Sequence, residues 1–164
     1  MILEVNKLVS TKPFEESEDI TFDKEKYKCV LPLIEIKKCH VKVDATNYND
    51  FIEVMILVDA VVLLESSYTL KPFEFHMLTG EEYHFGTSAY EGDDVIEYKG
   101  NIIKLDDYIF NLISASIPLS PKAPGETLPK SGKGYRILSE DDYEKEKQSS
   151  GDPRFSKLDD INFN

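Results

Sequence analysis

Six lysines between positions 24 and 42 have the type and spacing best suited to a binding chemistry. They are Lys24, Lys26, Lys28, Lys37, Lys38 and Lys42, and only Glu25 and Glu35 oppose them within this segment. Alternate positions of a strand point to the same face, so a strand over residues 19–29 would place the first three lysines side by side. Such a row could contact the phosphates of a nucleic acid. The alternative interpretation is a solvated sheet face without a ligand.

Other chemically capable residues lack the spacing that their chemistry requires. The segment 125–134 has six residues between Gly125 and Gly132, where a phosphate loop has four, and Gly134 stands where magnesium needs a hydroxyl. The soft metal ligands form no C-x-x-C or H-x-x-x-H pattern; they are Cys29, Cys39, His40, His76 and His84. Acidic neighbours such as Asp106 and Asp107 do not by themselves make an acid–base pair. The sequence therefore predicts no enzyme, no cofactor and no metal site.

Net charge limits the class of partner. The chain has 164 residues with 31 acids against 19 bases, a formal net charge of −12. Nucleic-acid binding draws on clustered positive charge, so this balance argues against binding through the overall field and favours a basic partner. The alternative is an acidic surface that serves solubility alone. There is no apolar run of about 18 residues and no basic-then-apolar leader, which predicts a cytoplasmic chain with free thiols and no membrane partner.

The elements that would position these residues are strands followed by one principal helix. One stripe of residues recurs at helical spacing along the segment 101–121, as Leu105, Tyr108, Ile109, Leu112 and Ser116. Phe110, Ile113 and Ile117 add a second apolar face, so we expect burial on more than one side. Pro118 ends the pattern, which predicts a helix over residues 105–116.

The region before the helix is predicted to form a sheet. Strands are expected over residues 1–5, 19–29, 32–43, 51–65, 69–77, 83–85 and 95–98, with a loop over 10–19. The segment 51–65 is apolar at both parities, which predicts a central strand covered on both faces, with a bend or bulge near Asp59.

These expectations combine into one domain of the α+β class. The sheet is expected to be curved, mainly antiparallel, and either open or barrel-like, with one principal packed helix. Residues 1–120 would form this sheet-plus-helix core. Residues 121–164 would be a loop and a partly mobile extended C-terminal segment of the same domain, with Ser139 as the N-cap candidate of a short polar helix.

Short motifs from residue 101 onward occur together in one known family. They are Ile103-Lys104-Leu105-Asp106, Ile117-Pro118-Leu119-Ser120-Pro121, Leu128-Pro129-Lys130-Ser131-Gly132, and Asp152-Pro153-Arg154 followed by Leu158. In order and spacing they resemble the YceD family, whose members are described as large ribosomal RNA subunit accumulation proteins. The matched family positions are Asp106, Pro118, Pro121, Pro129, Gly132, Asp152, Pro153 and Arg154. Many members also carry cysteines that here fall on Ser66 and Thr69, and on about Ala123, Leu128 and Ser131, so polar and hydrophobic contacts must order these loops instead.

The resemblance implies a non-enzymatic ribosome-biogenesis factor that acts in the accumulation of large-subunit (23S-type) rRNA. Two direct partners stay open. One is large-subunit rRNA or its precursor, contacted by the six lysines together with Lys130, Lys133 and Arg136. The other is a basic ribosomal protein, for which the chain would be an acidic binding module or chaperone. Subtracting the +4 of the lysine segment from −12 leaves −16 on the rest of the chain, which favours protein capture. The sequence leaves the oligomeric state open.

Overall fold

The computed structural model describes residues 1–87, 95–128 and 131–150. It divides the chain into two compact units, Met1–Ala123 and Pro124–Asn164. The first unit contains the sheets, the helix predicted over 105–116 and the hydrophobic core.

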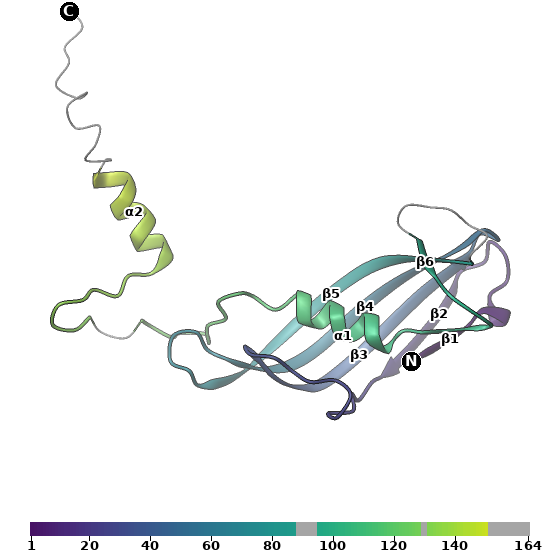
Figure 1. Ribbon diagram of the computed structural model, residues 1–164, viewed down its shortest axis with the longest axis horizontal. Helices are drawn as coiled ribbons and strands as arrows, with labels where there is room; N and C mark the ends of the chain where they lie inside the picture. Colours follow the sequence, from purple (N-terminus) through teal and green to yellow (C-terminus); the bar gives the residue numbers. More distant parts are fainter. Residues whose placement is uncertain (88–94, 129–130, 151–164) are drawn as a thin grey trace, which may run out of the picture. The chain divides into compact units, whose positions relative to one another are not determined.

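A five-stranded sheet forms most of the first unit (Figure 1). Its strands, in spatial order, are β2 (Phe14–Asp19), β3 (Leu33–Asn47), β4 (Phe51–Glu65), β5 (Pro72–Gly86) and β6 (Val95–Glu97). The first three pairings are antiparallel, and β6 runs parallel to β5. The α+β class and the mainly antiparallel sheet are therefore confirmed. Since β2 and β6 lie at opposite edges and do not pair, the sheet is open and barrel-like closure is not supported.

A second, two-stranded sheet leads into the helix. It pairs β1 (Ile2–Glu4), which precedes the short 3-10 helix η1 (Val5–Lys7), antiparallel with β7 (Ile102–Lys104). The helix α1 (Asp106–Ala115) follows β7 directly and lies along one face of the large sheet, against β4 and β5 (Figure 1). Gly100 adopts φ +83° in the turn between β6 and β7, a conformation that glycine adopts at little cost.

The core lies between α1 and the large sheet. Alternate residues of β4 are buried there, namely Ile52, Val54, Ile56, Val58, Ala60, Val62 and Leu64. From α1, Ile109, Leu112 and Ile113 meet this surface. Phe110 covers a second side of the helix by packing against Phe22 and Tyr27, as the two apolar faces predicted.

The other parity of β4 corrects one prediction. The central position of β4 is confirmed, but its second face is open, because Leu57 is 39% exposed and Asp59 is exposed. The reason is that α1 packs on one side of the sheet only. Pairing also runs without a shift through Asp59, and the register irregularities lie in β3, between Leu33 and Glu35 and between Ile36 and Lys38.

Two local predictions before β3 were wrong. Residues 10–19 were expected to be a loop, but Phe14–Asp19 is the edge strand β2. In this strand Phe14 is partly buried and the other five residues are exposed. Such a strand has no apolar alternation to reveal it. Residues 20–32 form an irregular connection in place of the strand expected over 19–29. Further on, the two strands predicted over 69–77 and 83–85 are parts of the single strand β5, which begins at Pro72.

The second unit contains the polar helix α2 (Glu140–Ser150). The Ser139 hydroxyl accepts a hydrogen bond from the backbone N–H of Asp142 (3.1 Å) and donates one to the Asp142 carboxylate (2.7 Å). This confirms the predicted N-cap. Within the part of the chain that the structure describes, neither helix has the length and apolar character needed to cross a bilayer.

Candidate functional site

The lysines expected on one strand face are on the irregular segment 20–32 and are largely neutralised. Lys24 pairs with Glu35 (2.6 Å), and this hydrogen bond raises the lysine pKa and lowers that of Glu35. Lys26 pairs with Asp107 of α1 (2.9 Å), and it also donates to the Tyr27 hydroxyl (2.6 Å). Lys28 alone of the three has no ion-pair partner among the described residues. The three lysines therefore do not share the face of a strand, on which the predicted row of phosphate contacts depended.

The lysines of β3 are also paired in large part. Lys37 reaches Glu74 of β5 (2.7 Å), which raises the pKa of Lys37 and lowers that of Glu74. Lys42 lies between Asp44 and Glu15, each 3.2 Å from its ammonium group. Lys38 is exposed and has no such partner among the described residues. Carboxylates thus accompany four of the six lysines, and no continuous basic surface results.

The other predicted residues are the family-motif positions and the basic residues that follow α1. Pro118 follows α1 in an exposed position, while Pro121 is buried and its carbonyl accepts a hydrogen bond from Ser67 N–H (2.8 Å). Asp106 forms an ion pair with the Met1 amino group. In the second unit, Lys133 is exposed, Arg136 pairs with Glu146 (2.9 Å), and Gly132 forms a bridge with Tyr135. Lys130, Pro129, Asp152, Pro153 and Arg154 lie outside the described residues.

Serines occupy two loop positions where the family carries cysteines, and each serine orders its own loop. The buried Ser66 hydroxyl accepts hydrogen bonds from the backbone N–H groups of Tyr68 (3.1 Å) and Thr69 (3.4 Å). The Ser131 hydroxyl accepts one from Ile137 N–H (3.0 Å). These local bonds supply the polar ordering that the sequence led us to expect.

The face of the sheet that points away from α1 is the larger candidate surface, and we call it the open face. The pairing register assigns to it Glu15, Ser17 and Asp19 of β2; Lys38, His40, Lys42 and Asp44 of β3; Glu53, Met55, Leu57, Asp59, Val61 and Leu63 of β4; and Glu74, His76, Leu78, Gly80, Glu82 and His84 of β5. Seven carboxylates thus face two lysines, with Lys37 reaching in from the irregular part of β3.

Apolar residues lie along the middle of the open face in two pairs, Met55 with Leu57 and Val61 with Leu63, and Asp59 lies between the pairs. We call these four apolar residues the apolar strip. Leu78 of β5 lies opposite Asp59 and is 79% exposed. Gly80 gives Leu57 its room, because a Cβ at this glycine would come within 2.6 Å of a Leu57 methyl group.

Histidine–carboxylate pairs lie on the open face beside the apolar strip. His40 pairs with Asp19 (2.7 Å) and His76 with Asp59 (2.6 Å). At one end, His84, Glu53 and Glu82 bring their donor atoms within 4.8 Å of one another, as a cation site would require. Sequence spacing missed this group because strand pairing, and not the chain, makes Glu53 and His84 neighbours.

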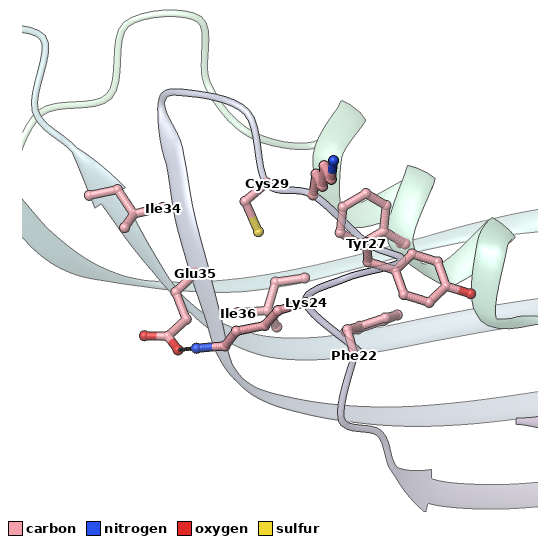
Figure 2. A pocket seen from close by; sticks show the side chains of 9 residues that line it. Phe22, Lys24, Tyr27, Cys29, Ile34, Glu35 and Ile36 are labelled. Atoms are coloured by element: carbon pink, nitrogen blue, oxygen red, sulfur yellow. Dashed lines mark hydrogen bonds and ion pairs between the residues drawn. The ribbon is translucent and has the colours of Figure 1, made fainter.

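A groove lies beside α1, away from the open face, and we call it the α1 groove. It consists of two adjoining pockets of about 500 and about 390 Å³, which share Lys28 and Phe110. The larger pocket is shown in Figure 2 and is further lined by Phe22, Lys24, Tyr27, Cys29, Ile34, Glu35 and Ile36. The smaller is further lined by Val30, Leu31, Pro32, Leu33, Asn111, Ser114, Ile117, Pro118 and Leu119.

The two cysteines are free thiols with raised pKa values. Burial raises the pKa of Cys39 to about 11, and burial followed by the charge of Glu35 raises that of Cys29. Cys39 belongs to the core, whereas His40 points to the open face, as their adjacency in a strand predicted. A thiol held protonated at neutral pH is a poor nucleophile, so neither cysteine suits covalent catalysis.

Comparison with known proteins adds no relative. No family model, no curated protein and no solved structure matches this chain. The resemblance to the YceD family therefore rests on the sequence motifs of residues 101–164.

Proposed function

We propose that this chain is a non-enzymatic ribosome-biogenesis factor that holds a basic ribosomal protein on its open face. The process, accumulation of large-subunit rRNA, comes from the family resemblance. The kind of direct partner comes from the charge distribution. In this proposal the chain acts in the cytoplasm, as an acidic binding module without metal or cofactor.

The observation that carries the proposal is the composition of the open face. Carboxylates surround the apolar strip of Met55, Leu57, Val61 and Leu63 on β4 and the neighbouring Leu78. An apolar centre within a polar, charged rim is the usual anatomy of a protein–protein interface. The excess of carboxylates selects a partner that presents lysine and arginine, and the net charge of −12 would accelerate its encounter.

Direct rRNA binding by the predicted lysines has weaker support. Lys24, Lys26, Lys37 and Lys42 each have a carboxylate within ion-pair distance, so a phosphate would have to displace that partner. Lys28 lies beside α1 and Lys38 on the open face, so the two cannot form one phosphate track.

The test measures both candidate partners with the same protein. Purified basic large-subunit ribosomal proteins and fragments of 23S-type rRNA are titrated separately by fluorescence anisotropy, at about 50 and 200 mM salt. We expect saturable binding of a ribosomal protein and no saturable binding of rRNA.

Two open-face variants locate the interface. Asp59→Asn with Glu82→Gln removes two carboxylates, and Leu57→Ser with Leu78→Ser removes the apolar centre. Each should weaken binding of the ribosomal protein by about tenfold.

The matched control is Glu16→Gln with Glu18→Gln. It makes the same charge change at positions of β2 that pair with the core residues Val43 and Val41, on the opposite face of the sheet. If this control weakens binding as much as Asp59→Asn with Glu82→Gln does, the open face is not the interface. Saturable binding of rRNA alone would replace the proposal by direct RNA recognition.

A further inference from the structure

The α1 groove has an apolar rim that the described residues of the chain leave exposed. Around its smaller pocket, Val30 is 78% exposed, Leu31 is 64% exposed and Leu119 is 99% exposed. Solvent-exposed apolar side chains are ordinary when scattered, but these three line one pocket. The floor between the two pockets is Phe110, which contacts the rings of Tyr27 (5.1 Å) and Phe22 (5.6 Å).

The lysines beside the α1 groove differ in whether a carboxylate pairs with them. Within the segment 20–32, Lys24 and Lys26 are neutralised by Glu35 and Asp107, whereas Lys28 has no ion-pair partner among the described residues. Lys28 also lines both pockets, which makes it a residue that the two pockets share. The groove therefore offers two largely apolar pockets that share one lysine without an ion-pair partner among the described residues.

This arrangement defines the ligand's chemistry. A nucleic acid is disfavoured, because one lysine without a partner cannot neutralise a run of phosphates, and an acidic group suits this lysine better than a basic one does. We propose that the α1 groove binds a segment of a partner protein that inserts one apolar side chain into each pocket and pairs an intervening carboxylate with Lys28. A fatty acid fits less well, because it has one apolar chain with its carboxylate at the end, whereas Lys28 is shared by two pockets. The groove is thus a second docking surface, with a charge preference opposite to that of the open face.

A defined peptide series tests the charge and the apolar requirement separately. The probe is a fluorescein-labelled amphipathic peptide of about twelve residues with leucine, glutamate and leucine at successive turns of one helix face. A second peptide has lysine in place of the glutamate, and a third has serine in place of both leucines. We expect the wild-type protein to bind the first peptide about fivefold more tightly than the second, and the third not at all.

Charge reversal in the protein is the decisive measurement. Lys28→Glu should reverse the preference, so that the lysine peptide binds more tightly than the glutamate peptide. Lys38→Glu is the matched control, since it makes the same change at another exposed lysine without an ion-pair partner, on the open face. It should leave the preference unchanged. Val30→Asp should abolish binding of the glutamate peptide.

Fold integrity is checked by thermal melting, because Lys28 and Val30 are exposed and their variants should melt as the wild type does. In ¹H–¹⁵N spectra the glutamate peptide should shift the amide signals of Lys28 and Phe110 and spare those of Leu57 and Leu78. Shifts confined to the open face, equal affinity for the glutamate and lysine peptides, or binding of decanoate but of no peptide would each overturn the inference. It does not rest on the function proposed above, because Lys28→Glu should leave binding of a ribosomal protein to the open face intact.

Discussion

Replacing Leu112 with aspartate tests whether α1 holds the first unit together. Leu112 is 6% exposed and lies on the helix face that meets the sheet, near the fully buried Ile109 and Ile113. An aspartate there would lose the apolar contact of the leucine and would place a carboxylate in the core.

The magnitude follows from these two terms. Removing a buried leucine side chain forfeits about 1.5–3 kcal/mol of burial free energy. A polar group left in the core without a partner adds about 1–3 kcal/mol. The sum, about 2.5–6 kcal/mol, is comparable with the whole unfolding free energy of many domains. A shift in melting temperature of at least about 10 °C is therefore expected.

Urea and thermal unfolding followed by circular dichroism would measure this loss. The control is Asn111→Asp, which introduces the same carboxylate at the adjacent, exposed position of the same helix. It should change the unfolding free energy by no more than about 0.5 kcal/mol. If Leu112→Asp melts within about 2 °C of this control, then α1 is not part of the cooperative core, and the role assigned to it is wrong.

The remaining predictions concern charge, pH, thiols and metal. Replacing Lys24, Lys26 and Lys28 together with glutamine distinguishes the two partners. If rRNA is bound directly, the slope of log affinity against log salt should fall by up to about 3. If a basic protein is bound, its affinity should stay the same or rise slightly. The Tyr27 hydroxyl and Lys26 lower the pKa of Asp107 below its ordinary 3.8. The stabilising contacts of the ionised Asp107 carboxylate are therefore present above that pH and are lost as the pH falls below it. Acid titration of the melting temperature should therefore show a smaller loss for Asp107→Asn than for the wild type. Iodoacetamide at neutral pH should modify the half-buried Cys29 well before Cys39, as peptide mass mapping would show, and equal rates would contradict the burial of Cys39. Elemental analysis of untagged protein should find no stoichiometric zinc, since Ser66 and Ser131 offer no thiolate, and one zinc that resists dialysis would refute this.

Much of the local structure could be predicted because it depends on neighbours in the chain. The period of 3.6 residues placed the helix over 105–116, and the structure has α1 at Asp106–Ala115. The strand predicted over 51–65 is β4 with the same bounds. Ser139 was identified as an N-cap because capping needs only residues within one helical turn. Where α1, β4 or α2 begins and ends is thus determined by short-range geometry.

The environment of each face could not be predicted, because it depends on which element packs there. The apolar residues of β4 at both parities suggested cover on both sides, yet the helix that packs on the sheet, α1, meets one side. The edge strand β2 escaped detection for a related reason, since an edge position demands no apolar alternation.

The candidate sites show the same division. By itself the sequence determined the number of lysines, the excess of acids and the apolar content of each segment. Only the tertiary structure decided that Glu35 and Asp107 would neutralise Lys24 and Lys26, whereas Lys28, which lines two pockets, has no ion-pair partner in the described part of the chain. Asp107 is 81 residues from Lys26 in the chain. Charges pair and pockets close by distance in space, and that distance is fixed only when the sheet and the helix pack together.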